Sequence, residues 1–209
     1  CMEYRNIILN FKIKIQNLTN IEDFPMIPVR LFKKFELKSI KKDQIIKKLV
    51  SSGTSGQEPS KIFLDQKNAT NQVKVLEKIM AKFIGKKRLP MLIIDQNPRL
   101  VSKKSFNARA AAIYGFSIFG KDHCFLINDE GEVDIEVLNN FLKSHGNNPF
   151  LIFGFTSLVY ENLLKKVFNK KIISSFKKGI LLHGGGWKKL EYLKIGNQEF
   201  KKLIKHKLG

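Results

Sequence analysis

The chain has 209 residues, 38 Lys and Arg against 18 Asp and Glu, a formal net charge of +20 and 43% hydrophobic residues. This hydrophobic content supports a folded core and excludes an intrinsically disordered chain. The longest apolar runs, such as Phe150–Phe155, are far shorter than the roughly 20 residues that cross a bilayer. The first residues also lack the apolar stretch of a secretory signal, so we expect no membrane span and a cytoplasmic location.

Lysine dominates the positive charge, because Arg occurs at only five positions. Proteins that read nucleic-acid sequence usually rely on Arg for bidentate contacts. The Lys residues come in pairs spread along the chain, such as Lys33–Lys34 and Lys188–Lys189, and do not form one cluster. This pattern is typical of solvated helix faces. We therefore expect no nucleic-acid partner, and a non-enzymatic basic nucleic-acid-binding protein remains the alternative of another class.

Short apolar strands alternate with segments of helical periodicity. Gly85 and Gly115 are expected to end two of the helices, and the hydroxyl of Thr156 or Ser157 to cap a third. The pattern favours an α/β fold with a mostly parallel sheet and helices on both faces, in which ligands bind at the carboxyl ends of the strands. The predicted strands are Lys61–Asp65, Leu89–Asp95, His123–Asn128, Phe150–Phe153 and Gly179–His183; the predicted helices are Asn71–Ile84, Ser105–Tyr114, Asp134–Ser144, Thr156–Phe168 and Gln198–His206.

The most informative segment is Ser51–Lys61, with the sequence SSGTSGQEPSK. Its glycines let backbone N–H groups turn toward a ligand, and its hydroxyls add hydrogen-bond donors, so the segment is suited to wrapping phosphate oxygens. It is not a Walker A loop, because Glu58 stands where that pattern requires Gly. By composition alone, a flexible Ser/Gly surface turn is an equal interpretation.

Ser51–Lys61 resembles the phosphate loop of the adenylate-forming superfamily, whose general pattern is [ST]-[ST]-G-[ST]-T-G-x-P-K. Ser55 replaces the usual Thr, and extra residues separate Gly56 from Lys61. This form is most similar to the acyl-protein synthetases of bacterial bioluminescence (LuxE type, long-chain-fatty-acid–luciferin-component ligases). Phe24–Lys33 is similar to the proline-containing segment ahead of the loop in that branch, and Leu181–Lys188 to its glycine-rich strand end.

The resemblance implies ATP-dependent activation of a carboxylic acid, expected to be a fatty acid, with Mg²⁺ as the accompanying ion. The acyl-adenylate would then donate its acyl group to a protein cysteine, with an acyl-accepting reductase as a partner. The residues implied to hold the nucleotide phosphates are Ser51, Ser52, Gly53, Thr54, Ser55, Gly56 and Lys61. Those implied to line the adenylate or acyl pocket are Phe155, Thr156, His183, Gly184, Gly185 and Gly186.

Several family features have no counterpart before Gly209. These are the segment with the Mg²⁺-binding Glu, the lid domain with its catalytic Lys, and a late acyl-carrying Cys. Residues 1–209 are therefore expected to form part of an N-terminal ATP- and acyl-binding domain without the C-terminal lid, and to be inactive alone in the full reaction. Cys1 before Met2 indicates a trimmed chain or an added residue.

Cys124 lies in an apolar strand-like run and is expected to be a core thiol, too early in the chain to carry the acyl group.

Two further functions stay open. One is an aryl- or short-chain acyl-CoA ligase of the phenylacetate-CoA-ligase kind, and the other is a non-catalytic domain that binds a partner protein.

Overall fold

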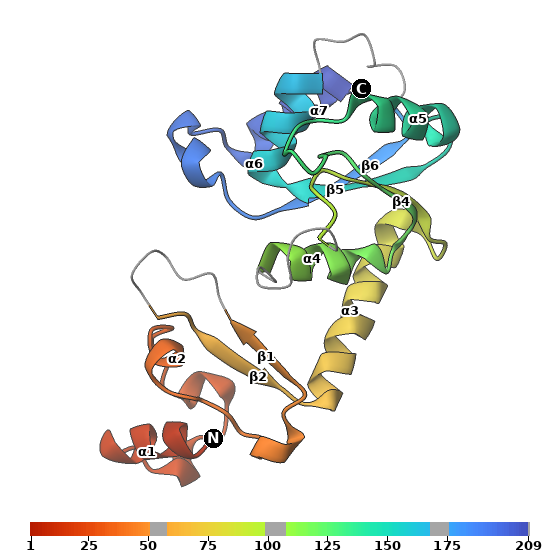
Figure 1. Cartoon of the computed structure of the whole chain (residues 1–209). Coiled ribbons are helices and arrows are strands. Elements are labelled where there is room, and N and C mark those ends of the chain that lie inside the picture. The colour runs from red at the N-terminus through yellow and green to blue at the C-terminus, as the bar shows by residue number, and fades with distance from the viewer. Residues whose placement is uncertain (51–57, 99–107, 168–175, 209) are drawn as a thin grey trace. The chain divides into compact units, whose positions relative to one another are not determined.

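The computed structural model describes residues 1–50, 58–98, 108–167 and 176–208 (Figure 1). The chain divides into two compact units, Cys1–Ile79 and Met80–Gly209. Helix α3 (Gln66–Ile84) crosses the division between them. It confirms the helix predicted over Asn71–Ile84 and begins five residues earlier. Gly85 ends it as predicted, with a φ of +74° and its N–H donating to the Ala81 carbonyl at 3.1 Å.

The first unit holds two strands that pair antiparallel, from Lys47↔Leu64 to Val50↔Lys61. The strand predicted at Lys61–Asp65 is confirmed, but its expected place in a parallel sheet is wrong, because its described partner is the strand that directly precedes the Ser/Gly-rich segment. Few apolar side chains of the described residues are buried here, chiefly Ile8 and Leu64. The elements are α1 (Met2–Asn10), α2 (Leu31–Lys34), β1 (Lys47–Val50) and β2 (Lys61–Leu64), with short 3₁₀ turns at Ile15–Asn17, Ile21–Asp23 and Lys42–Gln44.

The second unit contains a four-stranded sheet of order β4-β3-β5-β6, in which all neighbouring strands are parallel. This confirms the predicted parallel α/β arrangement for Met80–Gly209. β5, at an inner position, is almost wholly buried, as expected for a parallel strand covered on both faces. The strands are β3 (Leu89–Ile93), β4 (Gly120–Phe125), β5 (Phe150–Phe155) and β6 (Gly179–Gly184).

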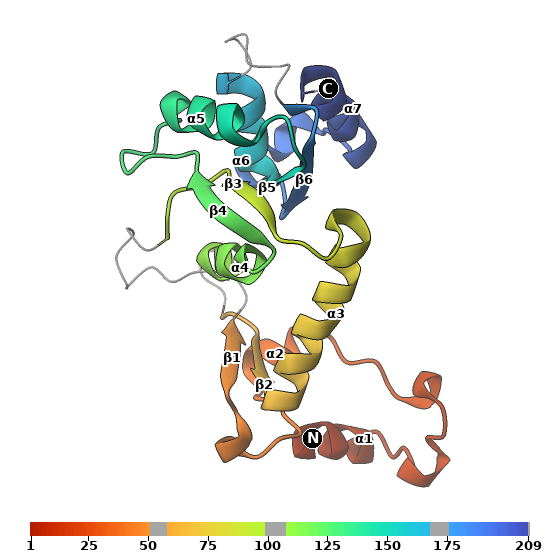
Figure 2. The same ribbon diagram turned by 90° about the vertical axis from the view of Figure 1, so that its right-hand side faces the viewer.

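Helices cover both faces of this sheet (Figure 2). On one face lie α5 (Ile135–His145), α6 (Thr156–Leu158) with the π-helix Val159–Val167 that continues it, and α7 (Asn197–Leu208). They bury a cluster that includes Leu92, Ile152 and Phe200. On the other face lies α4 (Ala108–Ser117), whose Phe116 packs against Phe153 with ring centroids 4.9 Å apart.

Two further predicted boundaries differ from the structure. Gly115 does not end its helix, since α4 continues to Ser117. The strand predicted at His123–Asn128 lies three residues earlier, because it pairs with β3 from Gly120. Leu126 and Ile127 are still buried, but as part of the turn that follows the strand.

A candidate active site at the carboxyl ends of β5 and β6

The register of β5 and β6 brings two predicted site segments together. Gly154 lies opposite His183, and Phe155 lies opposite Gly184. Because the strands are parallel, Thr156, which follows β5, lies at the same sheet edge as the glycines that end β6. Carboxyl ends of parallel strands are where α/β sheets bind ligands.

Thr156 joins the two strand ends through its hydroxyl. Its Oγ1 lies 3.0 Å from His183 Nδ1 and 3.1 Å from both the Gly184 and the Gly185 carbonyl oxygens. The predicted helix-capping role is wrong, because α6 has Phe155 as N-cap and makes no side-chain cap hydrogen bond. The hydroxyl is committed to the end of β6 instead.

One tautomer of His183 satisfies all three contacts of the Thr156 hydroxyl at once. A hydroxyl has one proton, and carbonyl oxygens only accept. If Thr156 donates toward the glycine carbonyls, His183 must donate from Nδ1, and its Nε2 then carries the free lone pair. Burial, followed by the charge of Lys201, lowers the pKa of His183 below its ordinary value. The imidazole is therefore neutral at neutral pH and able to accept a hydrogen bond or a proton at Nε2.

Gly185 occupies a position that no other residue fits easily. Its φ is +77°, and a Cβ there would lie 3.0 Å from Phe155 Cδ1. The Phe155 ring thus packs against the Gly185 backbone, and Lys188 Nζ lies 5.9 Å from the same ring. The close approach needs glycine at 185, whereas an added Cβ at Gly184 would meet open space.

A cavity of about 390 Å³ opens at this edge. Four predicted pocket residues line it: Thr156, His183, Gly184 and Gly185. Phe155 and Gly186 do not line this cavity. The Phe155 ring lies against the Gly185 backbone instead. The other lining residues were not predicted from the sequence as pocket residues, and they are Trp187, Asn197, Phe200 and Lys201.

The aromatic wall of the cavity consists of Trp187, which follows β6, and Phe200 of α7. The ring of Phe200 lies edge-on to both Trp187 and His183, with centroids 5.3 and 5.0 Å away. Trp187 in turn meets Tyr160 of the π-helix at 5.4 Å. These contacts hold the segment after β6 against α7. π-Helical turns are rare in proteins, and those that occur often lie at functional sites.

An ion pair that the sequence did not predict lies after the neighbouring strand β3. The Asp95 carboxylate is almost fully buried and accepts two hydrogen bonds from Arg109, from Nε at 2.6 Å to Oδ2 and from Nη2 to Oδ1. Two signals in the sequence point to it: an acidic residue directly after an apolar strand, and one of only five Arg residues at the start of the next helix.

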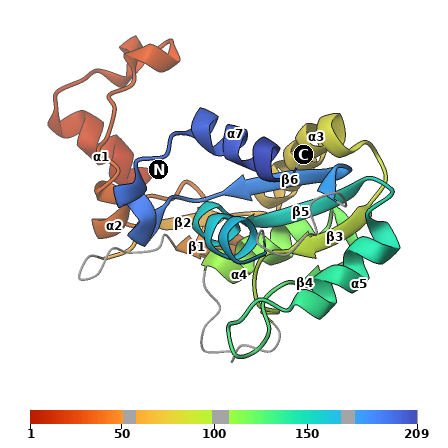
Figure 3. The ribbon, with the colours of Figure 1, turned by 90° about the horizontal axis from the view of Figure 1, so that it is seen from above.

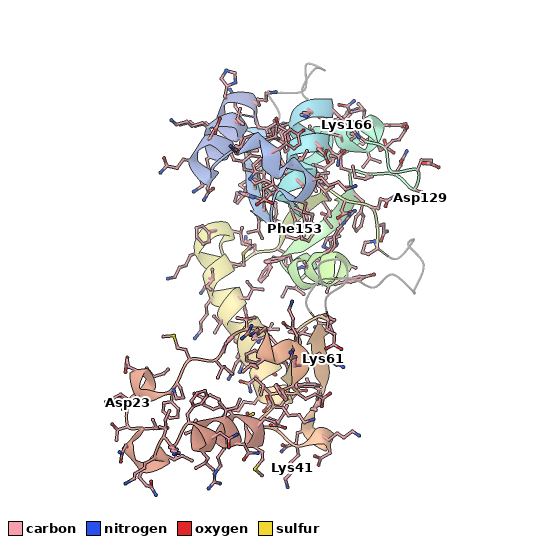
Figure 4. The ribbon with its side chains drawn as sticks, turned by 90° about the vertical axis from the view of Figure 1, so that its left-hand side faces the viewer. Asp23, Lys41, Lys61, Asp129, Phe153 and Lys166 are labelled. Atoms are coloured by element: carbon pink, nitrogen blue, oxygen red, sulfur yellow. The ribbon has the colours of Figure 1, made fainter. Side chains whose placement is uncertain are left out.

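The predicted phosphate loop is not settled by the structure. Ser51, Ser52, Gly53, Thr54, Ser55 and Gly56 lie outside the described residues. Lys61 is described, half-buried at the start of β2 (Figure 4). It belongs to the first unit, whereas Thr156 and His183 belong to the second.

The described residues gather no group of three or more His, Cys, Asp or Glu suited to hold a metal ion. In the same part of the chain, no helix is long and apolar enough to cross a membrane.

The fold and the cavity define an α/β protein with a cavity at the carboxyl ends of two parallel strands. The sequence model of the acyl-protein synthetase family LuxE matches residues 1–209, so the chain belongs to this family. No curated protein and no solved structure matches the chain. Family membership supports the predicted enzyme class, a ligase that joins an acyl group to a protein.

Proposed function

We propose that the protein activates a carboxylic acid, specifically a long-chain fatty acid, with ATP and passes the acyl group to a cysteine of a protein. In the first step a carboxylate oxygen attacks the α-phosphorus of ATP. The bond to the β-phosphate breaks, and pyrophosphate leaves. In the second step a thiolate attacks the acyl carbon, a thioester forms, and AMP leaves with the electron pair of the broken acyl–oxygen bond.

The observation that carries this proposal is the contact of Thr156 with His183 and the glycine carbonyls of β6. It holds an exposed glycine backbone open beside a neutral imidazole, in a cavity with a positive Lys201 at its margin. Bare backbone lets a planar, charged ligand approach closely. The polar lining suits the adenylate, whose formation depends on positioning and charge neutralisation.

The nucleotide phosphates are assigned in this proposal to Ser51, Ser52, Gly53, Thr54, Ser55, Gly56 and Lys61. Glycine-rich backbone and hydroxyl donors bind phosphate oxygens, and the Lys61 ammonium compensates their charge. In this proposal Mg²⁺ is held mainly by the phosphate oxygens of ATP.

Measuring ligand binding tests the proposed site independently of whether the chain catalyses the reaction. We would titrate the chain calorimetrically with ATP and with a stable acyl-sulfamate of adenosine, which stands in for the acyl-adenylate, and measure acid-dependent pyrophosphate exchange in parallel. Both ligands are expected to bind. Gly53→Asp should weaken both, and Thr156→Val the acyl-sulfamate more than ATP, while Thr156→Ser retains binding.

The acid panel in the exchange assay distinguishes substrates. Exchange with fatty acids supports the proposal, and exchange with aryl or short-chain acids alone would replace it with the acyl-CoA ligase alternative. Failure of both adenosine ligands to bind would refute adenylate chemistry in this chain.

A further inference from the structure

A second cavity, of about 350 Å³, adjoins the one described above and shares His183, Phe200 and Lys201 with it. It lies where α7 runs alongside β6 (Figure 3). The first cavity is lined largely by polar groups. The second lacks Thr156, the glycines, Trp187 and Asn197. It has instead two aliphatic side chains and a further Lys: Leu181, Ile204 and Lys205.

The spacing of residues along β6 and α7 explains which side chains line this second cavity. Leu181 and His183 are two apart on a strand and therefore face the same side of the sheet. Phe200 and Ile204 are four apart on α7 and form one row on the helix. Lys201 and Lys205 form the next row and are exposed. The cleft thus has an aliphatic and aromatic floor and a cationic rim.

The charge of the cleft restricts its occupant. Among the described residues, no Asp or Glu lines either cavity, and Lys201 borders both. The complementary ligand is an anion whose charged end lies beside His183 and Lys201 and whose body is aliphatic. A ligand confined to the first cavity would leave the Leu181–Ile204 surface uncovered.

We infer that the cleft between β6 and α7 binds the acyl chain of the substrate. The carboxyl group lies beside Lys201, and the methylenes next to it run between Leu181 and Ile204. Lys201 is a positioning residue for the carboxylate, and Ile204 sets how many methylenes are covered. This inference rests on the proposed function.

The length of the cleft limits what it covers. Leu181 to His183 spans about 7 Å of strand, and Lys201 to Lys205 about 6 Å of helix. Only the methylenes nearest the carboxyl group are buried over such a span. Affinity is therefore expected to rise about fourfold for each added methylene and then to level off once the chain outgrows the cleft.

The test is a titration of the whole chain with straight-chain carboxylates from butanoate to tetradecanoate, each below its micelle concentration. Ile204→Trp should move the plateau to shorter acids, and Ile204→Ala should flatten the rise. Lys201→Met should weaken all acids by a similar factor, about tenfold, and leave the length dependence unchanged. Lys202→Trp and Lys202→Met are the matched controls, because Lys202 is exposed on the same helix and lines neither cavity.

The outcomes separate the two claims. If acids bind and drive pyrophosphate exchange but the Ile204 variants keep the wild-type plateau, the acyl-chain site lies elsewhere and the proposed function stands. If no acid binds and the acyl-sulfamate of adenosine does not bind either, the proposed function fails and this inference with it. A folding defect in Ile204→Trp is detected by circular dichroism, and Ile204→Ala and Lys201→Met then decide.

Discussion

The Oγ1 atom of Thr156 lies 3.0 Å from Nδ1 of His183, and this one contact joins the start of α6 to the end of β6. The Thr156 side chain is buried, so water cannot readily take over the hydrogen bonds of its hydroxyl. Removing it leaves the Gly184 and Gly185 carbonyls and the imidazole N–H without this partner. We expect Thr156→Val to lower the free energy of unfolding by about 1 kcal/mol, measured by urea denaturation.

Thr156→Ser is the control for that experiment. It keeps the hydroxyl and removes one methyl group, so its loss should come from packing alone and leave the His183 contact in place. Equal loss in the Val and Ser variants would show that the hydroxyl network contributes nothing to stability.

Gly185 and Gly184 form a matched pair for substitution by Ala. Gly185 has a φ of +77° and would place a Cβ 3.0 Å from Phe155, whereas a Cβ at Gly184 meets no atom within 4 Å. Gly185→Ala is expected to cost about 2 kcal/mol, mostly through the left-handed backbone. Gly184→Ala should be nearly neutral. Combining Gly185→Ala with Phe155→Ala in a double-mutant cycle would measure the ring contact, and additivity would rule it out as a source of the cost.

Much of the second unit could be predicted from the sequence because its signals are local. β5 is an uninterrupted apolar run, and β6 is an apolar run up to His183. The helix α3, which crosses from the first unit into the second, carries apolar residues at helical spacing with Gly85 after it. The strand at Lys61–Leu64 was also predicted, but its partner was not. A strand of this length carries no mark of whether its neighbour runs parallel or antiparallel, and pairing with β1 decides it.

Part of the candidate site could also be predicted, because strand ends are local features of the sequence. Thr156, His183, Gly184 and Gly185 stand at predicted strand ends, so topology brings them together. The sequence did not indicate that Thr156 bonds across to β6, because a Ser or Thr before a helix is usually a cap. Nor did it place α7 beside β6, since that contact joins segments without a shared local pattern.

The Asp95–Arg109 pair should stabilise the second unit. The Asp95 side chain is 3% exposed and that of Arg109 40%, so loss of the guanidinium leaves a buried carboxylate. Arg109→Met is expected to lower the free energy of unfolding by about 2 kcal/mol. Arg109→Lys should recover only part of this, because Lys lacks the bidentate geometry. Wild-type stability in Arg109→Met would contradict the assignment.

The two cysteines should differ in reactivity. Cys124 is half-buried, and burial together with the nearby Asp122 raises the pKa of its thiol, whereas Cys1 is exposed. The thiolate is the reacting species, so alkylation at mildly alkaline pH should be about tenfold or more slower at Cys124 than at Cys1. Peptide mass spectrometry measures both rates, and in urea they should converge. Fast alkylation of Cys124 in the folded protein would reopen it as an acyl carrier.

The lowered pKa of His183 gives the stability of the second unit a defined pH dependence. The folded state binds a proton less readily than the unfolded state, whose His titrates near 6.5. Above pH 6.5 both states are neutral and the stabilising contribution is complete. As the pH falls below 6.5 the unfolded state takes up the proton first, so stability declines and levels off below the lowered folded-state pKa. Urea denaturation of wild type and His183→Gln across this range isolates the effect, since other acid titrations are shared. The variant should show the shallower decline, and parallel curves would place the imidazole in a solvent-like environment without the burial that lowers its pKa.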